Sequence, residues 1–586
     1  MTVDAEAILA GLDAEQRQAA ESTLGPVCLL AGAGTGKTTA ITHRIAYGVA
    51  TGVYSPGRVM ALTFTARAAA ELRGRLRMLG TTGVSARTFH ASALSQLGYF
   101  WPQTVGGLMP SILDSKGRLI AQAADSQKLK LDTAMLRDLA AEIEWRKVSM
   151  LTLDQYAAAL PGRAIAAAID PDKLVALHQA YEEVKDARRQ LDFEDVLLAT
   201  AGMIESEPWV AQQVRQQYRF FVVDEYQDVS PLQQHLLELW LGERQDVCVV
   251  GDASQTIYSF AGASSSYLLG FGTRYPNATV LQLESNYRSA PSIVAVANRL
   301  MRGRSGALEL RPAGFDTRAT PSPTTQPTEA LRNDTPQVRA FPSDSTEARA
   351  VASSIVELIE GGARPQDIAV LYRINVQGAA LETALSDAGV SYQLRGATRF
   401  FELPEVKQAL MMLKGAAVAS LGEPLFKTVS DVLRSLGWTQ NPPESRGAVR
   451  DRWDSLNAIM GLAEAAPAGT TIRQFVDELY ERAAAQHEPA LDAVTLATLH
   501  SAKGLEWENV YLVGLSEGYL PITYAKTDEA IDEERRLLYV GITRARKRLA
   551  LSWAASGQGR SGERVPSRFL EELRSRTPDA HPRSGE

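Results

Sequence analysis

One segment constrains the fold of this chain more than any other. An apolar run, Val27–Leu30, enters a glycine-rich turn that ends in Lys37-Thr38-Thr39, and a helical stretch follows. Glycines let backbone N–H groups approach phosphate oxygens, and the start of a helix adds positive potential there. The segment therefore predicts a phosphate-binding loop, with Lys37 at the β- and γ-phosphates and Thr38 on Mg²⁺. The loop itself reads Ala31-Gly32-Ala33-Gly34-Thr35-Gly36, with Ala31 where the general pattern has glycine.

A second apolar run, Phe220–Val223, ends in two carboxylates, Asp224 and Glu225. A carboxylate at the tip of a strand can hold Mg²⁺ directly or through water, which is the role we predict for Asp224. Its neighbour Glu225 is predicted to orient and deprotonate the attacking water. A solvated acidic turn is the alternative interpretation, and the phosphate-binding loop upstream makes the catalytic interpretation the stronger one.

Short apolar runs alternate with helical patterns through about 26–90 and 218–300, which predicts an α/β domain with a parallel sheet. A helical stretch that includes Met135–Trp145 and Leu174–Val184 interrupts it. A second α/β pattern follows and is interrupted by another helical stretch, at about 409–490. The further strands predicted in the two domains are Val59–Thr63, Val247–Val250 and Val280–Leu283, then Ile368–Tyr372, Val510–Val513 and Leu549–Trp553.

Composition excludes several classes of protein. No run of 18 apolar residues is present, and residues 1–12 lack the basic start of a secretory signal, so we expect a cytoplasmic protein without a membrane segment. The two cysteines, Cys28 and Cys248, lie in apolar runs and are predicted to be buried thiols; with seven scattered histidines they build no structural zinc site. A net charge of −7 argues against coating nucleic acid through bulk charge but allows a local groove for one strand.

Two arginines are candidates for the positive charge that phosphoryl transfer needs on the far side of its site. Arg288 lies in Leu283–Ser289, and Arg544 lies in Tyr539–Arg546. A lone arginine is more often a surface residue, so sequence context has to support both assignments.

Taken together, these segments resemble the superfamily 1A helicases of the UvrD/Rep/PcrA group, and within it the second UvrD-type paralogue of actinobacteria. The resemblance is collinear over roughly residues 10–570. Besides the two nucleotide segments it is carried by Leu12–Gln18, Ala61–Glu71, Thr88–His90, Asp192–Asp195, Asp224–Asp228 with Gln233, Val249–Tyr258, Leu283–Ser289, Asp367–Gln377, Thr498–Glu506 and Glu533–Arg546.

The resemblance implies two RecA-like P-loop domains, each with a mainly helical insertion. The first comprises residues 1–98 and 193–288 with the insertion 99–192. The second comprises 289–408 and 491–573, with a flexible loop rich in Pro, Thr and Ala at 311–336 and a reduced insertion at 409–490. Residues 574–586 are expected to form a disordered tail.

For the nucleotide, the resemblance implies that ATP lies between the two domains. Gln16 would read the adenine edge, Tyr287 would stack on the base, and Glu506, with Gly504 beside it, would contact the ribose. Gln255 would sense the γ-phosphate and couple it to DNA. Arg288 and Arg544 would act as arginine fingers, and Arg73 would link the phosphate site to the DNA groove.

For DNA, the resemblance implies a track of aromatic side chains for single strands and single/double-strand junctions. The matching positions are Phe64, Phe193, Tyr258, Phe260 and Phe569, and His90, Arg373 and His500 are the polar or phosphate contacts. Stacking on aromatic rings suits a motor that does not read sequence. For each aromatic residue, packing in a core is the alternative interpretation.

The chain departs from the family in three places. After Gln255 relatives have Ser-Ile-Tyr and then Arg-Trp-Arg-Gly-Ala, whereas this chain has Thr256–Ala263 with Phe260 in place of Trp and without either flanking arginine. The usual Asn-Lys pair is Ala66-Arg67. From these two differences we expect the groove either to bind DNA less strongly or to bind it through other residues. The 409–490 insertion is short, which weakens the expectation of autonomous unwinding. From the short stretch that follows Arg544 we expect no nuclease domain in this chain.

The sequence thus predicts an ATP-dependent DNA helicase that moves 3′ to 5′ on single-stranded DNA in repair or replication, as a monomer or weak dimer. The alternative is a translocase that strips bound protein and unwinds poorly without a protein partner. Two further hypotheses are a DNA-binding scaffold with an inactive ATP site and a P-loop enzyme that acts on small molecules. The intact nucleotide residues argue against the first of these, and the duplicated α/β plan with its aromatic track argues against the second.

Overall fold

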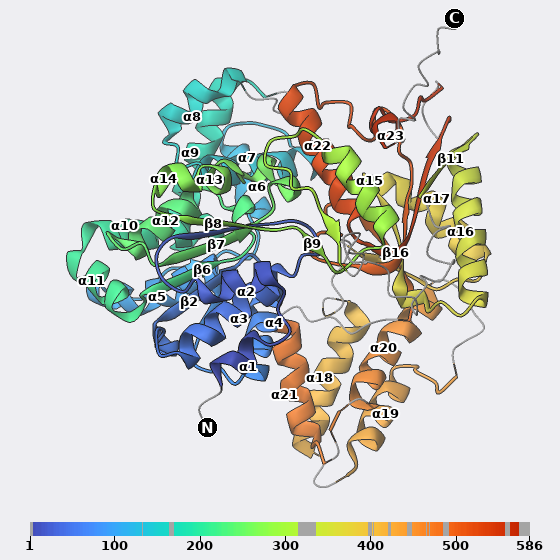
Figure 1. Cartoon of the computed structure of the whole chain (residues 1–586), viewed down its shortest axis with the longest axis horizontal. Helices are drawn as coiled ribbons and strands as arrows, with labels where there is room; N and C mark the ends of the chain where they lie inside the picture. Colours follow the sequence, from blue (N-terminus) through green and yellow to red (C-terminus); the bar gives the residue numbers. More distant parts are fainter. Residues whose placement is uncertain are drawn as a thin grey trace, which may run out of the picture. The chain divides into compact units, whose positions relative to one another are not determined.

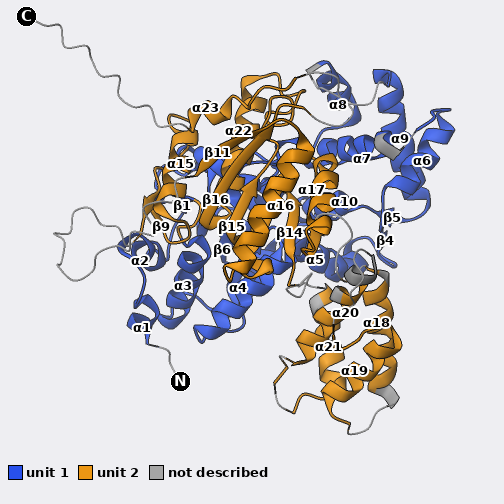
Figure 2. Ribbon diagram, turned by 90° about the vertical axis from the view of Figure 1, so that its right-hand side faces the viewer, with its two compact units in different colours: residues 1–32, 36–283 blue, residues 33–35, 284–586 orange. Residues whose placement is uncertain are grey.

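The computed structural model describes residues 4–131, 133–162, 169–313, 336–395, 401, 403–419, 423–441, 448–464, 466–467, 469–484, 492–556 and 563–573. The chain forms two compact units, coloured separately in Figure 2. Unit 1 comprises residues 1–32 and 36–283, and unit 2 comprises residues 33–35 and 284–586. The units therefore meet in sequence at 283/284, a few residues before the predicted boundary at 288/289.

Unit 1 is built on a six-stranded sheet in the order β3-β2-β6-β7-β1-β8, in which every described pairing is parallel (Figure 1). Its central strands are buried on both faces, which explains why they read in the sequence as unbroken apolar runs. The strands are β1 (Val27–Ala31), β2 (Val59–Thr63), β3 (Ser85–Thr88), β6 (Phe220–Val223), β7 (Val247–Gly251) and β8 (Thr279–Leu283).

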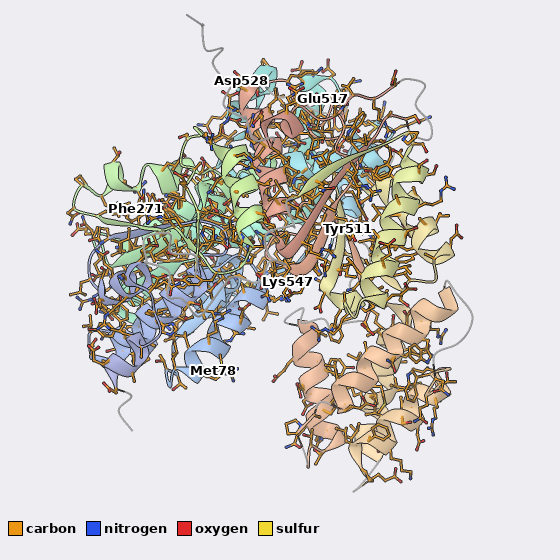
Figure 3. The ribbon with its side chains drawn as sticks, turned by 45° about the vertical axis from the view of Figure 1, so that its right-hand side comes forward. Met78, Phe271, Tyr511, Glu517, Asp528 and Lys547 are labelled. Carbon is orange, nitrogen blue, oxygen red and sulfur yellow. The ribbon has the colours of Figure 1, made fainter. Side chains whose placement is uncertain are left out.

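Helices cover both faces of this sheet. Alternate residues of one strand enter different cores, because successive side chains of a strand point to opposite faces. Val27 and Leu29 pack with helices α3 and α4, whereas Cys28 packs with α5, α10 and α12; both cysteines are buried free thiols, as predicted. The helices are α1 (Ala5–Leu9), α2 (Ala14–Glu21), α3 (Lys37–Ala50), α4 (Ala66–Met78), α5 (Phe89–Thr104), α10 (Phe193–Ser206), α11 (Pro208–Gln217), α12 (Pro231–Leu241), α13 (Ser266–Leu269) and α14 (Phe271–Arg274). Figure 3 labels Phe271, which is buried in this unit, and Met78, which is exposed at the end of α4.

The helical insertion of unit 1 has a core of its own, which runs from Leu113 to Tyr181. The predicted helices Met135–Trp145 and Leu174–Val184 are confirmed within α7 and α9. The predicted boundary at 98/99 falls inside α5, whose Phe89, Leu97 and Phe100 pack in the sheet-side core instead. The elements of this region are β4 (Ser111–Ile112), α6 (Gly117–Ser126), α7 (Thr133–Val148), α8 (Leu153–Ala159), α9 (Pro171–Ala187) and β5 (Gln190–Leu191).

Unit 2 repeats the plan with a six-stranded parallel sheet in the order β11-β16-β15-β12-β14-β13. This confirms the predicted α/β class with two parallel sheets. Tyr511 of β15, labelled in Figure 3, is buried, and its hydroxyl shares a hydrogen bond of 2.9 Å with Ser354 on helix α16 (Asp344–Glu360). The strands are β11 (Gln337–Phe341), β12 (Ile368–Tyr372), β13 (Tyr392–Arg395), β14 (Val494–Thr498), β15 (Trp507–Leu512) and β16 (Ala545–Ala554).

The helices of unit 2 form two groups. One group accompanies the sheet: α15 (Pro291–Met301), α16 (Asp344–Glu360), α17 (Gly378–Asp387), α22 (Asp528–Ile542) and α23 (Phe569–Glu572). The other group lies side by side in Figures 1 and 2 and packs around a separate core that includes Leu413, Leu433, Ile459 and Phe475. It comprises α18 (Pro404–Ala419), α19 (Leu425–Ser435), α20 (Ala448–Glu464) and α21 (Ile472–Ala484). The predicted helical character of 409–490 is confirmed for its described residues.

The described residues cover only part of the predicted loop 311–336 and none of the predicted tail. The predicted loop 311–336 begins with a short strand, β10 (Arg311–Pro312), paired with β9 (Ser285–Asn286). Backbone bonds from Arg311 and Ala313 to Glu284 and Asn286, both 2.8 Å, hold this pair. Residues 314–335 and the tail 574–586 lie outside the described residues. Among the described residues, no helix is long and apolar enough to span a membrane.

Candidate nucleotide-binding and DNA-binding residues

The predicted phosphate-binding loop follows β1 and leads into α3, as expected. Its N-cap, Gly36, has no side chain to bond the first N–H groups of α3, which leaves these donors to a ligand. The side chain of Gln16, buried on α2, borders the loop, since a Cβ on Gly36 would lie 2.6 Å from its Nε2 atom. Thr38 and Thr39 lie in the first turn of α3, directly after Lys37.

The tip of the loop, Ala33–Thr35, groups with unit 2. The Asn286 side-chain amide donates to the Ala33 carbonyl at 2.6 Å, and the Tyr287 N–H donates to the Gly34 carbonyl at 2.9 Å. Gly34 has φ +74°, and a Cβ there would meet Asn286 at 2.5 Å and Arg288 at 2.8 Å. Only glycine fits this close approach. Sequence reasoning missed Asn286, although it lies within the resembling segment Leu283–Ser289.

Lys37, Asp224 and Glu225 come together in unit 1. Lys37 Nζ lies 3.7 Å from Glu225 Oε2, and this buried ammonium has no hydrogen-bond partner among the described residues. The Glu225 N–H donates to Asp224 Oδ1 at 2.9 Å. Burial and the neighbouring Glu225 raise the pKa of Asp224 to about 7. A bound cation would favour the charged form of Asp224, and carboxylate oxygens such as those of Asp224 are ligands that suit Mg²⁺.

Arg73, predicted to link the phosphate site to the DNA groove, bonds to a neighbouring strand in this structure, and its role stays a prediction. Its guanidinium donates to the Ala86 carbonyl at 2.6 Å and lies beside Arg77 and Arg87, so it holds helix α4 to strand β3. Arg75 is the arginine of α4 that faces α3: it is bonded to Glu71 at 2.7 Å and reaches Thr39 Oγ1 at 3.4 Å. Two residues along a helix turn the side chain to a different face, which the sequence segment alone does not reveal.

In unit 2, Arg288 and Glu506 form an ion pair, and Arg288 also donates to the Thr543 carbonyl at 3.4 Å. Burial opposes the charge on Glu506, but Arg288 and Arg546 hold its pKa below the ordinary value. Gly504, predicted beside Glu506, has φ +80° in the turn that precedes it. Arg288 and Glu506, which were both predicted to contact the nucleotide, are therefore oppositely charged neighbours in unit 2.

Arg544 is buried in unit 2 in this conformation. Its guanidinium donates to the Val540 carbonyl at 2.9 Å and to the Leu505 carbonyl at 3.1 Å. A role as an arginine finger therefore requires these bonds to be exchanged or shared when a nucleotide is bound.

In unit 1, each of the predicted DNA-binding aromatic residues contacts another ring. Phe260 is 59% exposed, and its ring centroid lies 6.0 Å from that of Tyr258. Phe193 is 53% exposed and lies 6.0 Å, edge to face, from His90. Burial lowers the pKa of His90 to about 4, so we expect it to be a neutral contact at pH 7. Phe64 is half-buried against Phe89, with ring centroids 6.4 Å apart.

The residues of unit 2 that were predicted to contact DNA are more buried, or more fully paired, than those of unit 1. Arg373 forms a bidentate ion pair with the buried Glu534, at 3.0 and 2.8 Å. Burial, with Arg373 and Lys503 nearby, lowers the pKa of His500 to about 4. Phe569 has no exposed surface and is covered by Arg535, whose guanidinium lies 4.9 Å from the ring. The prediction that Phe569 stacks on a base is therefore not supported by this conformation.

Comparison with known proteins matches both halves of the chain. Residues 12–276 match the UvrD/REP helicase N-terminal domain, and residues 281–440 and 451–556 match the UvrD-like helicase C-terminal domain. The chain is 45% identical to the ATP-dependent DNA helicase UvrD2 of Mycobacterium bovis, over 98% of this chain and 83% of that protein. It is 29% identical to the ATP-dependent DNA helicase PcrA of Leuconostoc citreum, over 97% of this chain and 85% of that protein.

The chain therefore belongs to the UvrD-like helicase family. It is an enzyme, a DNA helicase whose ATP hydrolysis depends on DNA.

Proposed function

We propose that this helicase uses Mg²⁺-ATP to move 3′ to 5′ along single-stranded DNA and unwinds duplexes at single/double-strand junctions during repair or replication. The observation that carries the proposal is that one compact unit holds both parts of such a motor. Lys37 lies beside Glu225, and the half-buried Tyr258 with the exposed Phe260 follows Gln255 in the same unit.

In this proposal each nucleotide residue has a defined task. Lys37 and the N–H groups at the start of α3 hold the phosphates, while Thr38 and Asp224 hold Mg²⁺, which neutralises phosphate charge when bound. Glu225 orients and deprotonates the attacking water. Gln16, Tyr287, Gly504 and Glu506 hold the nucleoside, and Arg288 and Arg544 stabilise transition-state charge. Residues 1–98 and 193–288, and 289–408 and 491–573, form the two RecA-like cores.

A translocase that unwinds poorly without a protein partner is the second candidate. Two observations favour it: the described part of the second insertion consists of the helical group α18–α21 alone, and the turn Ser259–Ala261 carries no arginine. Contacts to the DNA phosphates supply much of the affinity for a strand. A motor with fewer such contacts transmits less force to a duplex.

Strand displacement on two matched duplexes, one with a 3′ tail and one with a 5′ tail, tests the proposal. We expect ATP-driven displacement of the 3′-tailed duplex alone, and none by the Lys37→Ala variant. Displacement of only the 5′-tailed duplex would refute the proposed polarity. If neither duplex is displaced while DNA still stimulates ATP hydrolysis, the translocase hypothesis is favoured over the helicase proposal.

Replacing Phe260 should change the affinity for DNA without changing its dependence on salt. Phe260→Ala removes an exposed stacking surface, so we expect binding of single-stranded DNA to weaken by about 1–3 kcal/mol. Phe260→Trp, with a larger ring, should bind at least as tightly as the wild type. Because no charge changes, the slope of log affinity against log salt should stay the same in fluorescence anisotropy titrations. Unaltered affinity of the alanine variant would remove Phe260 from the track.

A further inference from the structure

A chain of buried hydrogen bonds joins Glu225 to the turn that precedes Tyr258, entirely within unit 1. It runs through Gln227, in the short helix Tyr226–Asp228, and through Asp252, which caps the short helix Ala253–Gln255. Gln227 has no exposed surface, and Asp252 is nearly as buried. None of the roles assigned above to the nucleotide or DNA residues uses Gln227.

Gln227 bonds at both ends of its side-chain amide. Its Nε2 donates to Glu225 Oε2 at 2.5 Å, and its Oε1 accepts from the Asp252 N–H at 3.0 Å. The orientation of the amide is determined, because only its oxygen can accept from an N–H group and only its nitrogen can donate to a carboxylate. The side chain of Gln227 thus connects Glu225, the proposed general base, with Asp252 at the end of strand β7.

Asp252 continues the connection. Its Oδ1 accepts from the Ser254 N–H at 2.9 Å, and its Oδ2 accepts from Gln255 Nε2 at 2.7 Å. Both carboxylate oxygens therefore hold the turn 252–255 in shape. The chain leaves this turn through two buried residues and reaches Tyr258, the partner of the exposed Phe260.

The connection leaves little freedom at either end. Glu225 has φ +52°, a left-handed conformation that costs a non-glycine residue roughly 1–3 kcal/mol and persists only where the surroundings enforce it. A Cβ on Gly251 would lie 2.6 Å from Gln227 Oε1, so β7 approaches the amide as closely as a glycine permits. A shift of the 252–258 segment must therefore move Gln227, or leave a buried amide without a partner.

We propose that Gln227 is a positioning residue that couples occupancy of Tyr258 and Phe260 by a single strand to the placement of Glu225. This inference rests on the proposed function. When a base stacks on the aromatic pair, the 252–258 turn shifts, and the amide of Gln227 carries the shift to Glu225 Oε2. Water activation by Glu225 then depends on DNA, although Gln227 touches neither ATP nor the strand.

The test compares the ATPase kcat with and without single-stranded DNA in the full chain. Gln227→Met keeps the length of the side chain but removes both hydrogen bonds. We expect the ratio of stimulated to basal kcat to fall by about 5- to 150-fold, the usual range of coupling between two sites. The KM for ATP and the Kd for a single strand should stay close to wild type. The shorter Gln227→Asn cannot reach both partners and should lose the same coupling.

Gln234→Met is the matched control. Gln234 is also buried, and its amide also bonds at both ends, to the Tyr226 hydroxyl at 2.6 Å and to Glu238 at 2.6 Å, but it lies outside the connection. Its variant should keep the wild-type ratio. An unchanged ratio in both Gln227 variants, or an equal loss of stimulated and basal kcat, would overturn the coupling. A wild-type enzyme without any DNA stimulation would instead overturn the proposed function, and it is measured first.

Discussion

Glu225→Gln is expected to lower DNA-stimulated ATP hydrolysis about 10²- to 10⁴-fold, the usual contribution of a positioned general base. The amide that replaces the carboxylate cannot take a proton from water. Its oxygen can still accept from Gln227 Nε2, so the left-handed turn at residue 225 should be preserved. We therefore expect normal affinity for ATP and for single-stranded DNA in anisotropy titrations, whereas kcat, measured in steady-state assays with saturating ATP and DNA, should fall.

Glu205→Gln serves as the control for this substitution. Glu205 lies on α10 in the same unit, is half-exposed, and pairs with His235 at 2.9 Å. Its variant should hydrolyse ATP at the wild-type rate. If Glu225→Gln retains hydrolysis within about threefold of wild type, no general-base contribution of the usual size is present and another group activates the water.

Lys147→Met should destabilise unit 1 by about 3–5 kcal/mol, the typical cost of removing one partner from a buried ion pair. Lys147 is buried on α7, and its Nζ contacts Asp192 and Asp195 at 2.7 Å each and Glu182 at 3.1 Å. The substitution leaves the buried Asp192, the N-cap of α10, dependent on Lys185 and the Tyr181 hydroxyl. Urea unfolding followed by tryptophan fluorescence measures the loss.

Lys173→Met is the matched control, because Lys173 is exposed on α9 of the same insertion; its effect should stay within about 0.5 kcal/mol. A change of similar size in both variants would show that the buried cluster contributes little.

The same cluster predicts a loss of stability in acid. Burial opposes the charge on Asp192, but Lys147 and Lys185 hold its pKa below the ordinary value. A carboxylate with a lowered folded-state pKa stabilises the fold above its unfolded pKa of about 3.9, and that contribution disappears as the pH falls through the folded value. The difference in unfolding free energy between wild type and Lys147→Met should therefore shrink below about pH 4.

The sequence predicted most central strands and missed the edge strands β3, β11 and β13, whereas the edge strand β8 was predicted as Val280–Leu283. Five strands are buried on both faces: β1, β2, β6, β7 and β12. Because both faces of such a strand contact the core, its residues form a continuous apolar run in the sequence. β3 and β11 lie at sheet edges, and β11 is almost wholly exposed, so neither needs such a run. β14, in contrast, is largely buried, but its run Val494–Thr498 follows the insertion directly and was not recognised.

The nucleotide residues could be predicted because phosphate binding needs particular residue types in a fixed order next to a strand. Helix faces and burial were harder. Arg73 and Arg75 differ by two positions, and only the packing of α4 shows that Arg75 faces Thr39. Phe569 occupies a resembling position but is covered by Arg535. Gln227 lies within the resembling segment Asp224–Asp228, but the sequence does not show its two hydrogen-bond partners, one of which is 25 residues away.

The helices α18–α21 have a consequence for how this family can diversify. Strands β13 and β14 are parallel neighbours, with Tyr392 opposite Val494, and parallel neighbours must be joined by a crossover. The helical group is that crossover, and its core is separate from that of the sheet. A change in the length of this helical group therefore need not alter the register of the two strands that it joins. Relatives can thus differ in the size of this segment while they keep the same order of strands in the sheet.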